Sequence, residues 1–351
     1  MKENWLIYGA TGFTGRLVAE EALRRGHHPV LAARSAEKLG ALAGSLGLDS
    51  IAFDLQGGDR LARILEDFQA VFHAAGPFRL TGGPMLTACL KAGTHYLDIT
   101  GEIPVLEANL ALDPQAKAAG ISVVSGSGFD VVPTDCLANI VAHRLSHPTY
   151  LEIAFAGISR SSAGTIKSGL VEAPLEVMIR RDGRLVHAPL GFGGKWVCFS
   201  DRERYVLPVP WGDVATAYHS TGIGNIVVYM AFPPQVAASL RTFGLTIQGL
   251  LRPRGVQALV SKAVDLFVRG PDEEARRTNR SYIWAWARNE LGESREAWLE
   301  TIEPYQFTAV TGVRCVEKVL AGEVQPGAFT PAQAYGSDFI LEMPETRLLD
   351  A

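Results

Sequence analysis

The sequence predicts an α/β protein with a doubly wound parallel sheet in its N-terminal part and a second, α+β domain of mostly antiparallel sheet. Three observations support this fold class. Through about the first 140 residues, short apolar runs alternate with segments of helical apolar spacing. A glycine-rich turn follows the first apolar run, and strand-like pieces beyond about residue 140 follow one another without long helices. At 351 residues the chain is long enough for two domains with separate cores.

The N-terminal strands are expected at Trp5 to Tyr8 and in "HPVLAARS", "SIAFDL", "AVFHAAGPF", "HYLDITGE" and "ISVVSGSGFD". Helical segments at 16–26, 36–46, 59–68 and 82–93 separate the first five of these strands. This alternation implies parallel strands joined by right-handed crossovers. Ligands of such sheets bind outside the carboxyl ends of the strands, and here each strand ends in a polar or glycine-rich cluster.

In the second part, strand-like pieces are "TYLEIAFAGIS", "RLVHAPLG", "KWVCFS", "YVLPVPWGDV", "NIVVYMAF" and "RRTNRSYIWAWARN", with helices expected near 165–180 and 235–269. Tyr282, Trp284 and Trp286 alternate onto one face, which we interpret as sheet core or an interface, so a homodimer is plausible. A helix in "PYQFTAVTGVRCVEKVLAG" is expected to return to the first domain. We therefore predict a dinucleotide-binding domain at 1–137 plus about 303–351, and a substrate and dimerisation domain at 138–302.

Composition narrows the class of protein. Hydrophobic residues make up 47% and charged residues 20%, which is ordinary for a soluble globular chain. A net charge of −4 and a pI near 6.1 provide no basic field for nucleic acid. The four cysteines lie far apart without metal-ligand spacing, so we expect reduced thiols, no metal site and a cytoplasmic location. No signal peptide or transmembrane segment is predicted, although an amphipathic helix at 235–251 leaves peripheral membrane contact open.

The stretch "WLIYGATGFTGRL" reads as strand, tight turn and helix, with glycines at positions 9, 12 and 15. In a Rossmann unit the first glycine permits the turn, the second lets the backbone approach a pyrophosphate, and the third lets helix and strand pack closely. The phosphates then rest on unpaired N–H groups at the helix N-terminus. A plain tight turn is the alternative interpretation. The expected cofactor contacts here are Gly9, Thr11, Gly12, Phe13, Thr14 and Gly15.

The second strand indicates which dinucleotide is bound. An NAD site usually has an acidic side chain about twenty residues past the glycines, and this chain has Arg34 there, followed by Ser35 and Lys38. A guanidinium matches a phosphate, so NADP(H) is the better fit, and a solvated arginine that opens a helix is the alternative. Small residues at the fourth strand end leave room for the nicotinamide half. The further cofactor candidates are Asp54, Ala75, Gly76, Pro77, Thr100 and Gly101.

These stretches together resemble the saccharopine dehydrogenase-like oxidoreductases, which include saccharopine reductases and trans-acting enoyl reductases. The resemblance is carried by "YGATGFTGRLVAE", "AARSAEKL", "AAGPF…GGPMLTACLKAGTHYLDITGE", "GSGFDVVPTD", "SAGTIKSG" and "GAFTPAQAYGSDFI". It implies a Rossmann domain with an inserted substrate domain, a C-terminal return to the first domain, and NADP(H). Short-chain dehydrogenases also begin with such a turn, but they need a tyrosine with lysine four residues on, and none of the nine tyrosines has one.

The protein must orient the hydride acceptor and move a proton. Candidates at the ends of strands five and six are Tyr96 as a proton donor and Asp98 or Glu102 with Asp130, because paired carboxylates in a cleft can have separated pKa values. Helix capping and packing are the alternative roles, and His73 is expected to be a satisfied core histidine. In "SRSSAGTIKSG", an anionic small-molecule substrate is expected to meet Arg160, Thr165, Lys167 and Ser168.

Three functions remain open from the sequence. The first is an NADP(H)-dependent reductase of a C=N or C=O bond in a small molecule. The second is an enoyl reductase of carrier- or CoA-bound acyl chains, for which the apolar content at 240–267 leaves room. The third is a nucleotide-binding module without chemistry, since a Rossmann fold alone does not imply catalysis.

Overall fold

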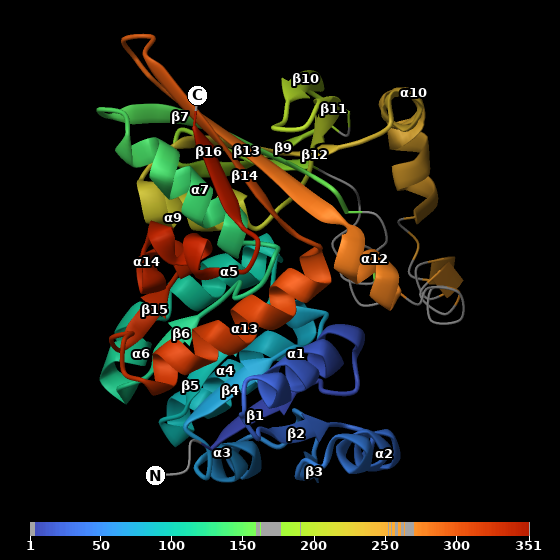
Figure 1. The fold of residues 1–351 in the computed structure, drawn as a ribbon, viewed down its shortest axis with the longest axis vertical. Coiled ribbons are helices and arrows are strands. Elements are labelled where there is room, and N and C mark those ends of the chain that lie inside the picture. The colour runs from blue at the N-terminus through green and yellow to red at the C-terminus, as the bar shows by residue number, and fades with distance from the viewer. Residues whose placement is uncertain are drawn as a thin grey trace. The chain divides into compact units, whose positions relative to one another are not determined.

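The computed structural model describes residues 4–158, 162, 177–189, 191–251, 253, 255–256, 259–260, 263 and 270–350. The chain forms two compact units, each with its own sheet (Figure 1). Unit 1 comprises Met1–Val132 and Tyr305–Gly336, and unit 2 comprises Pro133–Pro304 and Ser337–Ala351.

Unit 1 is built around a seven-stranded sheet in the order β15-β6-β5-β4-β1-β2-β3, and all its strand pairs are parallel. The predicted doubly wound parallel sheet is confirmed. Its strands are β1 (Trp5–Tyr8), β2 (Val30–Ala33), β3 (Ser50–Ala52), β4 (Ala70–His73), β5 (His95–Asp98), β6 (Ser122–Val124) and β15 (Gly327–Phe329). Its helices are α1 (Phe13–Arg24), α2 (Ala36–Leu46), α3 (Asp59–Leu65), α4 (Phe78–Ala92), α5 (Ile103–Leu110), α6 (Asp113–Ala119), α13 (Pro304–Leu320) and α14 (Pro331–Tyr335).

Helices pack on both faces of this sheet. Residues of α3, α4 and α6 share one apolar core with Tyr8, Val71 and Tyr96 of the strands. On the other face α13 lies so close to β4 that a Cβ at Gly312 would come within 2.6 Å of the Phe72 ring. Figure 1 shows α1 and α13 together in front of the strands. The helix expected at 304–322 therefore returns to the first sheet, as predicted.

Unit 2 contains a nine-stranded sheet with the main order β10-β11-β12-β7-β13-β14-β16, in which β8 pairs with β12 and β9. Only the β12–β7 pair is parallel among the pairs described, so the mostly antiparallel prediction is confirmed. Its strands are β7 (Pro148–Ala156), β8 (Val177–Arg181), β9 (Arg184–Ala188), β10 (Lys195–Cys198), β11 (Glu203–Pro208), β12 (Asn225–Ala231), β13 (Arg280–Asn289), β14 (Ser294–Ile302) and β16 (Arg347–Asp350). Its helices are α7 (Val132–His143), α9 (Asp213–Thr221), α10 (Pro234–Leu251), α12 (Glu273–Thr278) and the 3₁₀ helix η1 (Ser337–Glu342).

Two sequence predictions need correction. The stretch 337–351 was expected in the dinucleotide-binding domain, but it belongs to unit 2 because β16 pairs with β14. The helix expected near 165–180 is wrong at its end, where 177–180 belong to β8. Val177 and Ile179 alternate into the core of unit 2, and this two-residue period favours a strand. Residues 165–176 lie outside the described part of the chain.

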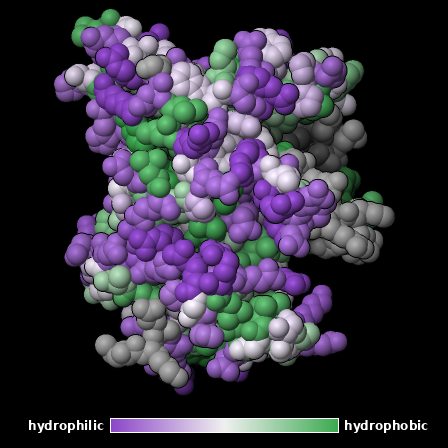
Figure 2. All heavy atoms as spheres, in the orientation of Figure 1, coloured by the Kyte–Doolittle hydropathy of each residue, from purple (hydrophilic) through white to green (hydrophobic). Residues whose placement is uncertain are grey.

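The aromatic strand has the core role predicted for it. Trp284 of β13 is 7% exposed and belongs to a buried cluster with Tyr229 and Val206, against which Tyr282 and Trp286 pack. Elsewhere, hydrophobic residues reach the surface in separate patches among hydrophilic ones (Figure 2). Among the described helices, none combines the length and apolarity that crossing a bilayer requires.

Candidate functional site

The glycine turn after β1 has the geometry that its spacing predicts. Gly9 has φ +88, a backbone conformation that side chains disfavour. A Cβ at Gly9 would also lie 2.8 Å from the Ala75 backbone nitrogen, and one at Gly15 would lie 2.3 Å from the Gly9 oxygen. The first glycine therefore makes the turn, and the third allows α1 to pack onto it.

The N-terminus of α1 is suited to an anion. Gly12 is the N-cap residue and offers no side chain of its own as a cap, and the first turn carries no acidic residue. Thr11 and Gly12 are exposed, whereas Phe13 and Thr14 are partly buried, with the Phe13 ring edge-on to Tyr305 at 5.1 Å. The starts of α2 and α4 are capped by the side chains of Ser35 and Glu102. The N–H groups at a helix start and the positive end of the helix dipole fit a diphosphate.

Arg34 and Lys38 are both exposed at the start of α2, directly after β2. Within the described residues, the Arg34 guanidinium makes no hydrogen bond or ion pair. Ser35 caps α2 through its hydroxyl, which accepts from the Lys38 backbone N–H at 3.5 Å. Asp54, exposed after β3, accepts from the Gln56 N–H at 3.0 Å. The arginine thus remains available for a ligand phosphate, while the serine hydroxyl already has a structural role.

The end of β4 passes next to the glycine turn. Ala75 is partly buried beside Gly9, and the Thr81 hydroxyl donates to the Ala75 carbonyl at 2.6 Å. The Gly76–Pro77 bond is cis, and Pro77 is the N-cap of α4. A side chain larger than alanine at position 75 would fill the space beside Gly9.

Glu102 serves α4 in a way that the sequence spacing did not reveal. Its carboxylate oxygens accept from the backbone N–H groups of Phe78 and Arg79, each at 2.7 Å, and the residue is 3% exposed. Its own N–H donates to the buried Thr100 hydroxyl at 3.1 Å. Glu102 therefore satisfies the N-terminal amides of α4 and stabilises the positive end of the helix dipole.

Asp98, at the end of β5, is fully buried and saturated with hydrogen bonds. One carboxylate oxygen accepts from the Gly126 N–H at 2.9 Å and the Thr100 N–H at 3.0 Å. The other accepts from the Ser125 hydroxyl at 3.1 Å and the Asn109 amide at 3.3 Å. Burial raises the pKa of Asp98 to about 6, and these hydrogen bonds oppose that rise. The carboxylate ties the end of β5 to the loop after β6.

Tyr96 lies two residues before Asp98 on the same face of β5 and is also fully buried. Its hydroxyl is 3.1 Å from Nδ1 of His73, and burial raises its pKa well above the ordinary value. His73 is only half satisfied, because its Nε2 has no partner within the described structure. Burial lowers the pKa of His73 to about 3, so the imidazole is neutral. Tyr96 thus packs in the core of unit 1, in the same strand as Asp98.

Asp130 is the exception among these carboxylates. It is partly buried in the loop after β6, and no hydrogen bond to its carboxylate occurs within the described residues. A Cβ at Gly101 would lie 3.0 Å from its Oδ2, so the glycine makes room for it. Burial raises the pKa of Asp130 to about 7, with no hydrogen bond to oppose the rise. Near neutral pH this carboxyl group can both hold and release a proton.

Other residues position this loop, and sequence analysis did not identify them. The Thr308 hydroxyl of α13 accepts from the Phe129 N–H at 3.0 Å. A Cβ at Gly128 would lie 2.8 Å from the Thr308 methyl group. Asn109 of α5 donates to Ser125 at 2.8 Å as well as to Asp98. Thr308 and Asn109 lie on helices separated in sequence from this loop, and neither residue belongs to a recognisable sequence motif. Their role is therefore visible only in the folded chain.

The predicted substrate residues Arg160, Thr165, Lys167 and Ser168 lie outside the described residues. Asp135, five residues after Asp130 in the chain, belongs to unit 2, and its carboxylate accepts from the Ser220 hydroxyl at 2.6 Å. The four cysteines are free thiols, and all but Cys198 are buried.

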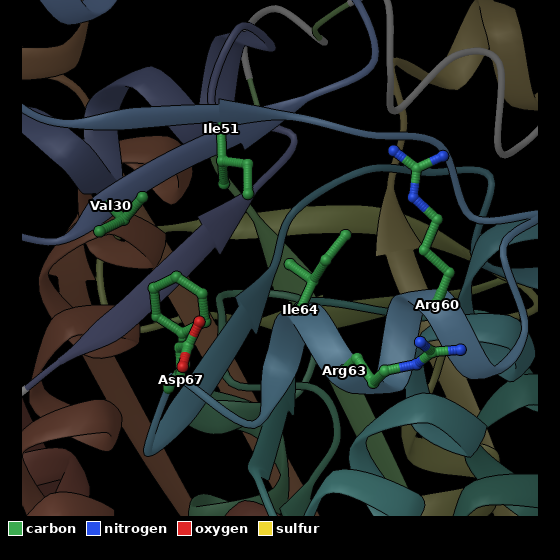
Figure 3. A pocket seen from close by; sticks show the side chains of 7 residues that line it. Val30, Ile51, Arg60, Arg63, Ile64 and Asp67 are labelled. Atoms are coloured by element: carbon green, nitrogen blue, oxygen red, sulfur yellow. The ribbon is translucent and has the colours of Figure 1, made fainter.

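A hollow in unit 1 lies apart from these residues. It is lined by Val30, Ile51, Arg60, Arg63, Ile64, Asp67 and Phe68 (Figure 3). Val30 is the first residue of β2, whereas the glycine turn and Arg34 follow strand ends. The hollow is therefore not part of the cofactor site proposed at the carboxyl edge.

Comparison with known proteins identifies the first part of the chain. Residues 5–124 match the family model described as the saccharopine dehydrogenase NADP binding domain. The match covers 120 of the 351 residues, so it describes this segment and not the whole chain. The cofactor is accordingly NADP(H), and the glycine turn, the glycine N-cap of α1 and Arg34 are consistent with it.

Individual proteins are also similar to this chain in sequence or in fold. Trans-acting enoyl reductases of Mycobacterium tuberculosis and Mycobacterium leprae are 35% and 36% identical over 138 residues, which is 37% of this chain and 33% of each relative. A further M. tuberculosis relative is 31% identical over 182 residues, 49% of this chain and 43% of that protein. The matches therefore span less than half the length of these relatives. A structure of saccharopine dehydrogenase (L-Glu forming) from Saccharomyces cerevisiae covers 99% of this chain and is itself covered completely, with a TM-score of 0.65 at 15% identity. It shares the fold.

Proposed function

We propose that this protein is an NADP(H)-dependent oxidoreductase that reduces a C=N or C=O bond of a small molecule. The observation that carries the proposal is Asp130, a carboxyl group without a hydrogen-bond partner in the described structure and with a pKa of about 7. It follows β6, at the sheet edge where the glycine turn and Arg34 would hold the cofactor. A pKa near the working pH is what general acid catalysis requires.

Bound NADPH supplies a hydride to the electrophilic carbon. The electron pair of the reduced bond moves onto nitrogen or oxygen, and that atom takes the proton of Asp130. The resulting carboxylate regains a proton from water, so one hydride and one proton have added to the substrate. In this scheme Glu102 and Asp98 hold α4 and the loop after β6 in place, and Tyr96 supports β5.

Asp130→Asn tests the proposal because it keeps the shape and removes the acid. Steady-state rates of NADPH oxidation across a panel of imines, ketones and enoyl thioesters should fall by about 10²- to 10⁴-fold for the substrate that the protein accepts. NADPH affinity, measured by fluorescence titration, should stay the same. In the reducing direction the active form is protonated, so kcat should fall above pH 7 by about tenfold per pH unit if proton transfer limits the rate.

Three results would contradict the proposed function. A variant that keeps its rate and pH profile would exclude Asp130 as the acid. NADPH binding without oxidation across the whole panel would favour a nucleotide-binding module. Equal affinity for NADH and NADPH would argue against the contact between Arg34 and the 2′-phosphate.

A second candidate is reduction of an enoyl bond on a carrier- or CoA-bound acyl chain, which the names of the relatives favour. The hydride would then add to the β-carbon, and the proton of Asp130 would go to the α-carbon. The same panel separates the two candidates, since only this one predicts turnover of enoyl thioesters. For either reaction the proposed substrate contacts are Arg160, Thr165, Lys167 and Ser168. A cytoplasmic location and a homodimer also remain hypotheses.

A further inference from the structure

We propose that the hollow of unit 1 in Figure 3 binds a small monocarboxylate with an apolar body, such as an aryl- or alkyl-substituted carboxylic acid. The hollow has a volume of about 460 Å³, which is within the range of small-molecule pockets. It lies apart from the residues proposed to hold the cofactor, so this proposal does not depend on the reaction proposed above.

The hollow forms where the sheet of unit 1 ends. β3 is an edge strand of that sheet, and its Ile51 lies opposite Ala32 of β2. Val30 comes two residues before Ala32, so Val30 and Ile51 lie on the same face of the sheet. Both are partly buried and line the hollow together with residues of α3 and the turn that follows it. The side of the hollow formed by the strands is therefore apolar.

α3 and the residues directly after it form the other side of the hollow. The residues of α3 that belong to the core of unit 1 are Leu61, Ala62 and Leu65. The residues of this segment that line the hollow and carry most of its charge are Arg60, Arg63, Ile64 and Asp67. Each lies three or four residues from another member of this set, so they share a helix face that the core does not use.

The positive charges in the hollow are available to a ligand. Within the described residues, neither the Arg60 nor the Arg63 guanidinium makes a hydrogen bond or an ion pair. Asp59, the first residue of α3, already pairs with Lys91 at 2.8 Å. Figure 3 shows both arginines on one side of the hollow and Asp67 on the other. An anion is therefore attracted to the arginine side and repelled from the opposite side.

This charge pattern selects the class of ligand. A planar carboxylate can accept two parallel hydrogen bonds from a guanidinium. Two guanidiniums and one carboxylate leave the hollow with one net positive charge, which favours a monoanion over a dianion. The apolar body of the ligand then lies against Ile51, Ile64 and Phe68. Ile51 and Phe68 also pack against the core of unit 1, which holds this apolar wall in place.

Isothermal titration calorimetry with the full chain tests the proposal, with 4-phenylbutyrate as the probe and 4-phenylbutyramide as its neutral counterpart. The wild-type chain should bind the acid about tenfold more tightly than the amide, because only the acid forms ion pairs with the two guanidiniums. Arg60→Gln and Arg63→Gln should each weaken binding of the acid by about threefold and change binding of the amide little. The matched control is Arg277→Gln, which removes the same charge from an exposed arginine of α12 in unit 2 and should change neither.

A second variant tests the apolar part of the hollow. Ile64→Trp places a larger side chain there, so it should weaken binding of the acid and the amide alike, by about tenfold or more. Circular dichroism melting and an unchanged NADPH affinity establish that the variants are folded. The proposal would be overturned if the wild-type chain did not bind the acid or bound acid and amide equally. It would also be overturned if Arg63→Gln weakened binding of the acid no more than Arg277→Gln does.

Discussion

The turn after β5 and the loop after β6 both place carboxylates at the carboxyl edge of the unit 1 sheet, yet they differ in how these groups are hydrogen-bonded. Asp98 accepts four hydrogen bonds and Glu102 accepts two from the start of α4. Asp130 accepts none within the described residues. A carboxylate whose lone pairs are filled by the fold serves the fold, whereas one that the fold leaves unpaired is available to a ligand. The same distinction separates Ser35, which caps α2, from its neighbour Arg34.

The largest effect that tests this comparison is expected at Asp98. Asp98→Ala leaves the N–H groups of Gly126 and Thr100 and two side-chain donors buried without an acceptor. The free energy of unfolding should fall by about 3 kcal/mol or more, measured by urea denaturation. Asp130→Ala should cost much less, since no donor loses its partner. Equal losses of unfolding free energy in the two variants would mean that the fold depends on both carboxylates alike.

A smaller effect is expected at Glu102. Glu102→Gln keeps the side-chain size but removes the charge and replaces one acceptor oxygen with an amide that faces a backbone N–H. The free energy of unfolding should fall by about 1–2 kcal/mol, because α4 loses part of its N-terminal cap. Glu66→Gln, at an exposed residue that follows α3, is the control and should change stability little. If Glu102→Gln were as stable as this control but inactive, Glu102 would join Asp130 as a candidate for the chemistry.

Local patterns allowed prediction of much of unit 1. Gly9 and Gly15 are predictable because their positions follow from the steric needs of one short turn. Residues 337–351 were misplaced because β16 pairs with a strand distant in sequence, and such pairing leaves no local signal. Asp98, Glu102 and Asp130 were all identified as candidates, but their different roles depend on partners such as Asn109 and Thr308, which only folding brings near. Sequence predicts which polar groups reach the edge, and it does not show which of them the fold satisfies.

Arg34 extends the comparison to the other end of the cofactor, where the expected effect on stability is the smallest of the three. Because no ion pair within the described structure uses its guanidinium, Arg34→Ala should leave stability almost unchanged. A charged hydrogen bond to the 2′-phosphate is worth about 1.5–3 kcal/mol, so NADPH affinity should fall by about tenfold or more, while NADH affinity stays the same. Fluorescence titration of both dinucleotides measures this, with Arg60→Ala in the hollow of Figure 3 as a control that changes neither. A loss of stability without a change in the ratio of the two affinities would mean that Arg34, like Asp98, serves the fold.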